Sequence, residues 1–68
     1  MLFKYAKLRG RIVEKFGTIE RFSDEVGLSK VAVSKKLNGR TQFSAADMEF
    51  WCEKLKIDLS EVSQYFFN

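Results

Sequence analysis

The sequence predicts an all-α fold, a compact bundle of five short helices that contains a helix-turn-helix formed by the second and third helices. Apolar residues recur at helical spacing along the chain, and three of the four glycines stand where such segments end. No alternating apolar run is bounded by hairpin turns, so strands have no comparable support. Because a core of 68 residues is too small to divide, residues 1–68 are expected to form a single domain.

The first predicted helix runs from Tyr5 to Phe16. Leu8 and Ile12 lie at helical spacing within it, and Gly17 is placed to end it as a left-handed cap. Gly10 lies inside this helix, where glycine costs about 1 kcal/mol relative to alanine. A close approach by another backbone would explain that glycine.

Two short helices are predicted next. Thr18 is placed to cap the second helix, which Gly27 ends. Ser29 is placed to cap the third helix, which covers 30 to about 37 before Asn38-Gly39 terminates it.

The fourth and fifth helices carry similar start signals. Ser44 precedes Asp47 by three residues, as in a capping box, and Asp58 precedes Glu61 by the same spacing. The fifth helix is expected to reach about Phe66. The fourth helix carries an apolar stripe of Met48, Trp51, Cys52 and Leu55.

Residues 18–39 carry the functional signal. Two helices of about two turns are joined by only three residues, and such a joint needs a positive φ at its start and a small residue at the helix contact. Gly27 supplies the first requirement and Ser23 the second. The residues expected to build this helix-turn-helix are Phe22, Ser23, Val26, Gly27, Leu28, Val33 and Leu37.

On these residues the segment resembles the lambda-repressor/Cro-like helix-turn-helix family, especially small Cro-type phage and prophage regulators. Residues 52–62 also resemble that family's closing segment, so the resemblance covers most of the chain. Ser23 stands where the family most often has Ala. Lys36 occupies a usually apolar position and Leu37 an often polar one, so either the third helix is slightly rolled or Leu37 takes over the packing.

The resemblance implies a sequence-specific transcriptional regulator, by default a repressor, whose third helix enters the major groove of double-stranded DNA. Lysines donate to guanine, and a valine can meet a thymine methyl. The expected base contacts are Ser29, Lys30, Val31, Ser34 and Lys35, and the expected phosphate contacts are Thr18, Lys36, Arg40 and Thr41. Arg9 and Arg11 are weaker candidates, equally compatible with backbone contact and with solvated surface.

Charge distribution supports a polyanionic partner. Residues 1–43 hold ten basic and four acidic side chains, a net +6, whereas residues 44–68 hold two and five, a net −3. From Lys30 to Arg40 there are four cations and no anion. One basic face suits DNA, although a solvated basic surface would produce the same asymmetry.

The surplus of aromatic residues predicts self-association. Phe16, Phe22, Phe43 and Trp51 suffice for the core, and Phe3 and Phe66 are expected to close it between the termini. The rings left over are Phe50, Tyr65 and Phe67. They are expected to form a weak homodimer contact, in free protein or only on an inverted-repeat operator, unless they too belong to the core.

Other classes have little support in the sequence. The chain has no histidine, its single cysteine lies in an apolar stripe, and it has no metal-ligand spacing or phosphate loop. We therefore expect no enzyme activity, metal, cofactor or small-molecule ligand. A single cysteine cannot form an intramolecular disulfide, which indicates a reducing, cytoplasmic location. Neither a membrane span nor a signal peptide is expected. The alternative function is a protein-interaction module on a helix-turn-helix frame, antitoxin-like or a regulatory partner protein.

Overall fold

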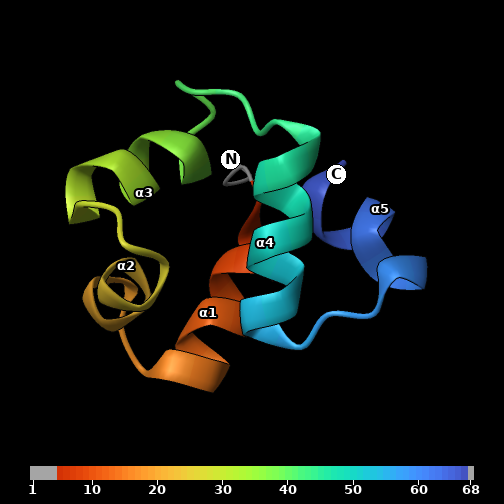
Figure 1. Ribbon diagram of the computed structural model, residues 1–68, viewed down its shortest axis with the longest axis horizontal. Coiled ribbons are helices and arrows are strands. Elements are labelled where there is room, and N and C mark those ends of the chain that lie inside the picture. The colour runs from red at the N-terminus through yellow and green to blue at the C-terminus, as the bar shows by residue number, and fades with distance from the viewer. Residues whose placement is uncertain (1–4, 68) are drawn as a thin grey trace.

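The computed structural model describes residues 5–67, which form five α-helices and one 3-10 helix joined by short loops (Figure 1). They are α1 (Ala6–Phe16), α2 (Ile19–Val26), α3 (Lys30–Leu37), α4 (Ala45–Leu55), η1 (Leu59–Glu61) and α5 (Val62–Phe66). No strand occurs within this range. The predicted all-α class is confirmed. The prediction for Phe3 concerns a residue outside the described part of the chain.

The predicted caps begin three of the helices. The hydroxyls of Thr18, Ser29 and Ser44 each accept the backbone N–H three residues later at 3.1 Å. The Asp47 carboxylate accepts the Ser44 N–H in return, which completes the capping box of α4. Such caps satisfy N–H groups that the helix itself leaves without an acceptor.

The fifth helix begins later than the sequence predicts. Asp58 accepts the N–H of Ser60, only two residues on, at 3.1 Å. This tighter turn starts the 3-10 helix η1, and α-helical geometry begins only at Val62.

The explanation predicted for Gly10 is wrong. Among residues 5–67, no atom outside its own helix lies within 4 Å of the position that a Cβ would occupy at Gly10, and the residue is exposed. An alanine would fit there without displacing a neighbour.

The core draws on every α-helix. Its members are Leu8, Ile12, Phe22, Val26, Val33, Leu37, Trp51, Cys52, Leu55, Ile57, Tyr65 and Phe66. Phe43, from the loop before α4, joins distant parts of the chain, because its ring meets Trp51 and Phe66 edge-to-face at centroid distances of 4.9 and 5.0 Å. Tyr5 packs on the same ring at 5.3 Å. Edge-to-face geometry is the favoured arrangement for aromatic pairs.

Tyr65 was predicted as a dimer contact, and the structure corrects this prediction. Its side chain is only 8% exposed and belongs to the core, and Lys7 Nζ lies 5.0 Å from its ring centroid. Burial therefore removes Tyr65 from any contact surface. Phe50 and Phe67, in contrast, are exposed as predicted.

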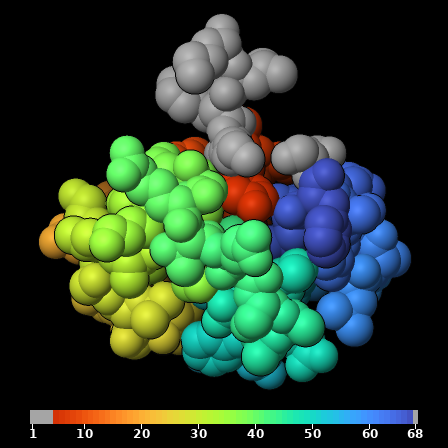
Figure 2. All heavy atoms as spheres, turned by 90° about the horizontal axis from the view of Figure 1, so that it is seen from above, coloured from red at the N-terminus to blue at the C-terminus, as the bar shows by residue number. Residues whose placement is uncertain are grey.

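The arrangement of the helices leaves one side of α3 open. α4 contacts α1, α2 and α5, whereas the main neighbour of α3 is α2. Figure 1 shows α3 and α5 on opposite sides of α4, and Figure 2 shows α3 on the side of the molecule away from the C-terminal segment. The outer face of α3 is thus separate from the surface around Phe67.

Candidate functional site

The joint between α2 and α3 has the geometry predicted for residues 18–39. Gly27 adopts φ 75°, in the left-handed region, and the N–H of Leu28 donates to Ser23 O at 3.0 Å. Ser23 is 2% exposed, and its hydroxyl donates to Ile19 O at 2.9 Å. A serine is therefore tolerated at this tight helix contact, since it is small and its polar atom is satisfied.

The packing of this segment agrees with the prediction for four residues and corrects it for one. Phe22, Val26, Val33 and Leu37 are buried in the core. Leu28 was expected to help build the helix-turn-helix through its side chain, yet that side chain is exposed. Its contribution is the backbone hydrogen bond to Ser23, because a residue in the joint lies at the rim of the helix pair.

The outer face of α3 forms a shallow concavity, which we call the α3 concavity. It is lined by Lys30, Val31, Ser34, Lys35, Asn38 and Arg40. Four of the five predicted base-contact residues therefore lie together, and Val31 is 64% exposed without any packing role. Ser29 is exposed just before it, where its hydroxyl caps α3.

The loop after α3 folds back on the end of that helix. The N–H groups of Arg40 and Thr41 both donate to Lys35 O, at 2.9 and 3.3 Å. This arrangement presents the Arg40 side chain beside α3, in the α3 concavity. Thr41, and Thr18 at the start of α2, are exposed as a phosphate contact requires.

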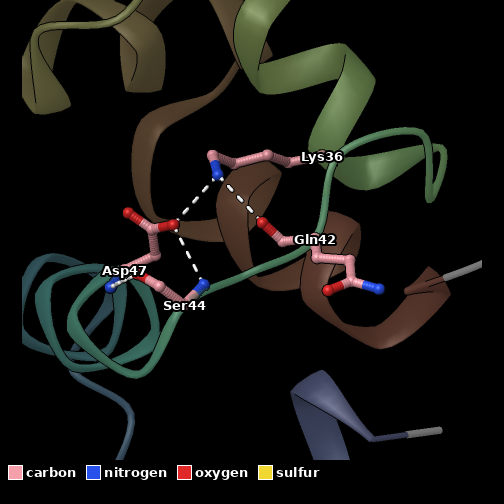
Figure 3. Close-up of polar contacts among 4 residues, drawn as sticks. All are labelled: Lys36, Gln42, Ser44 and Asp47. Atoms are coloured by element: carbon pink, nitrogen blue, oxygen red, sulfur yellow. Dashed lines mark hydrogen bonds and ion pairs between the residues drawn. The ribbon is translucent and has the colours of Figure 1, made fainter.

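Lys36 was predicted to contact phosphate, but it is engaged within the fold (Figure 3). Its Nζ lies 3.0 Å from Asp47 Oδ2 and donates to Gln42 O at 3.3 Å. The ammonium also lies 5.4 Å from the Phe43 ring centroid, and the side chain is 12% exposed. Lys36 therefore holds the loop to α4, and its charge is compensated before any ligand arrives.

The Asp47 carboxylate is correspondingly stabilised in its ionised form. The backbone N–H of Ser44 and the ammonium of Lys36 lower its pKa below the usual value, the Ser44 hydrogen bond being the larger cause. Hydrogen bonds to the charged form favour that form.

The two arginines of α1 also contact other parts of the fold. Arg11 donates to the carbonyls of Leu55 and Lys56, at 2.9 and 2.7 Å, and so satisfies the C-terminal end of α4. Arg9 Nη2 donates to Asn38 Oδ1 at 2.5 Å. The sequence left open whether these arginines contact the DNA backbone or form solvated surface. Arg11 is instead a structural residue, and Arg9 lies next to the α3 concavity.

A second hollow, which we call the α4 groove, is not predicted by any pattern in the sequence. It is lined by Ala46, Glu49, Phe50, Cys52, Glu53, Ile57 and Leu59. Leu59 is 69% exposed, and it belongs to a 3-10 turn whose three residues carry no periodic signal. The α4 groove thus contains two exposed apolar side chains, Phe50 and Leu59, and two acidic ones, Glu49 and Glu53.

The described residues contain no metal-binding cluster, reactive thiol or membrane-spanning helix. Among residues 5–67 no three His, Cys, Asp or Glu side chains gather where a metal ion would bind. Burial raises the pKa of the Cys52 thiol, so this group remains protonated as part of the core. Across the same residues, no helix has the length and apolar character needed to cross a membrane.

Comparison with known proteins assigns a family. Over residues 1–68 the chain matches the family described as "Protein of unknown function (DUF739)". The chain belongs to this family. No curated protein matches it.

One solved structure extends the assignment of this DUF739 chain. The chain is similar to the modulator of repression (MOR) of the temperate bacteriophage TP901-1 from Lactococcus lactis, known from a solution structure. The two share 34% sequence identity and a TM-score of 0.87, over 100% of this chain and 92% of the MOR chain. The DUF739 chain thus has the fold of a phage regulatory protein, which points to a regulatory role, and the narrower resemblance to Cro-type regulators stays a prediction.

Proposed function

We propose that the chain is a phage-type transcriptional regulator that binds double-stranded DNA through α3. The observation that carries this proposal is the α3 concavity, where two lysines and an arginine surround Val31 on a face that the core does not use. A helix whose outer face is free and basic can enter the major groove.

Each side chain of the concavity has a role in this proposal. Lys30 and Lys35 donate to guanine O6 or N7, and Val31 meets a thymine methyl group. Ser29 and Ser34, on the same side of α3, add hydroxyls of low selectivity. Arg40, Thr41 and the N-terminus of α2 at Thr18 hold phosphates, which fix position without reading sequence.

The effect of binding is proposed from the similar structure. The TP901-1 protein is by its name a modulator of repression. We infer that this chain likewise acts on repression. It is either a repressor that occludes a promoter or a protein that modulates a repressor.

A dimer on an inverted repeat remains part of the proposal, with Phe50 and Phe67 as the candidate contacts. Two recognition helices would then lie about 34 Å apart, one turn of DNA. The α4 groove argues against a two-fold pairing through Phe50, because Glu49 and Glu53 of both copies would face one another. Phe67, 66% exposed, is the better candidate.

Selection of bound duplexes from a random DNA library tests DNA binding. We expect a preferred sequence that is bound more tightly than random duplex at physiological salt. A chain that retains no duplex, or binds all duplexes equally, would refute sequence-specific recognition.

A second candidate function, a protein-interaction module, is favoured by the α4 groove. Exposed Phe50 and Leu59 line the α4 groove together with Glu49 and Glu53, and this combination fits a partner segment that is both apolar and basic. The partner would be a repressor protein whose activity this chain modulates.

A repression reporter distinguishes the two functions. The chain is expressed beside the repressor and operator of the same phage, and Phe50→Ser is compared with Lys35→Ala. If the effect on the reporter depends on DNA contact, Lys35→Ala abolishes it and Phe50→Ser preserves it. The reverse pattern would assign the function to the α4 groove.

A further inference from the structure

Asn38 lies at the edge of the α3 concavity, although its place in the sequence indicates only a helix terminator. Its N–H donates to Ser34 O at 2.9 Å and closes the last turn of α3. Its side chain is exposed and lines the concavity beside Lys35 and Arg40. A carboxamide at this place can both donate and accept hydrogen bonds.

Arg9 determines which end of the Asn38 carboxamide faces outward. A guanidinium can only donate hydrogen bonds, so the atom that accepts from Arg9 Nη2 at 2.5 Å is the amide oxygen of Asn38. The Asn38 NH₂ is therefore turned away from Arg9, and within residues 5–67 it has no hydrogen-bond acceptor. Asn38 thus presents a donor to whatever occupies the concavity.

Within residues 5–67 the Arg9 side chain makes one hydrogen bond, the one to Asn38. The Arg9 side chain is half-buried, and its Nε is buried without a hydrogen-bond partner in the described part of the chain. The hydrogen bond to Asn38 is charge-assisted, a class roughly twice as strong as neutral hydrogen bonds. Arg9 therefore acts on the concavity through Asn38.

We propose that Asn38 is a DNA-contacting residue that donates to an acceptor oxygen or nitrogen, and that Arg9 is the positioning residue that sets its orientation. This inference rests on the proposed function. The acceptor is either a backbone phosphate or the edge of a base, and both accept from an amide NH₂.

A double-mutant cycle on duplex binding tests the pair. The variants are Asn38→Ala, Arg9→Met, which keeps the aliphatic volume, and the two combined, with Lys15→Ala at the far end of α1 as a cation-removing control. We expect each single variant to weaken binding about tenfold and the double variant to weaken it no further. Losses that multiply, with a salt slope smaller by about one for Arg9→Met, would show that Arg9 contacts phosphate itself and overturn its positioning role.

Asn38→Asp separates donor from acceptor. The carboxylate keeps the pairing with Arg9 but has no proton to donate, so binding should fall at least as far as in Asn38→Ala. Wild-type affinity in either Asn38 variant would overturn the assignment. Equal losses on selected and random duplexes identify a phosphate acceptor, and a loss confined to the selected duplex identifies a base edge.

An NMR measurement on the free protein and the binding of the wild-type chain separate the role of Asn38 from the proposed function. In the free protein, the Asn38 side-chain ¹⁵N–¹H₂ signals should shift in Arg9→Met, and unchanged signals would contradict the positioning contact. A wild-type chain that binds no duplex overturns the proposed function together with the DNA role of Asn38. A wild-type chain that binds while Asn38→Ala binds equally well overturns the role of Asn38 alone.

Discussion

Lys36 Nζ lies 3.0 Å from Asp47 Oδ2, and this contact joins the last turn of α3 to the first turn of α4 across the intervening loop. The same carboxylate oxygen accepts the Ser44 N–H at 3.1 Å. One carboxylate therefore completes the cap of α4 and, through Lys36, holds the loop that carries Arg40 and Thr41.

Lys36→Met should lower the stability of the fold without changing the salt dependence of DNA binding. The substitution removes the partner of a partly buried carboxylate, and we expect a loss of about 1 kcal/mol in the free energy of unfolding. Chemical denaturation measures this loss. A salt slope of DNA binding that falls by about one unit in Lys36→Met would instead restore Lys36 as a phosphate contact.

Acid should remove part of the stability that Asp47 supplies. The pKa of Asp47 is lowered in the folded chain, so its contribution is present above the unfolded value near 4 and is lost as the pH falls through the folded value. Asp47→Asn should therefore be less stable than wild type at pH 7, and the difference should shrink below about pH 4. Thermal unfolding at several pH values measures this.

Asp58 provides the control for that acid dependence. Hydrogen bonds from the Ser60 hydroxyl and N–H lower its pKa too, although its carboxylate is exposed. Asp58→Asn should leave the Asp47 effect intact. If Asp47→Asn and wild type lose stability in parallel down to pH 2, the lowered pKa of Asp47 does not contribute to folding.

Lys30→Ala and Lys35→Ala should each weaken binding to the selected DNA site more than binding to random duplex. Each loses one base contact, a cost of about 1–3 kcal/mol, and relaxes the preference at one position. Binding titrations on both duplexes measure the two losses. Equal losses would reassign the lysines to phosphate contacts.

Arg40→Ala should weaken binding to every duplex alike. One fewer counterion is released, so the slope of log K against log salt should fall by about one. Titrations at four or more salt concentrations give the slope. A changed sequence preference at constant slope would argue against a positioning role for Arg40.

Tyr65→Ser and Phe67→Ser should behave differently, although both rings belong to the C-terminal segment. Tyr65 is buried, so its truncation should destabilise the fold by about 3 kcal/mol, whereas Phe67→Ser should stay within about 0.5 kcal/mol of wild type. Thermal unfolding compares them. If Phe67→Ser also abolishes cooperative binding to two half-sites, Phe67 is the dimer contact, and unchanged cooperativity excludes it.

Local patterns determined the first four helices and most of the outward face of α3. A cap such as Ser29 or Ser44 acts within three residues, and a glycine such as Gly27 acts on its own backbone, so these signals are complete in the sequence. The register of α3 followed from Val33 and Leu37 facing inward, which left Lys30, Val31 and Lys35 on the other side.

Only the tertiary structure decided which of the remaining side chains are free. Lys36 and Asp47 are eleven residues apart, Arg9 and Asn38 twenty-nine, and no periodicity links members of either pair. Tyr65 and Phe67 differ in burial because α5 is short and ends between them, a boundary set by packing on α1 and α4. A side chain's type and local register show what it can do, but its availability depends on partners that the chain brings near only by folding.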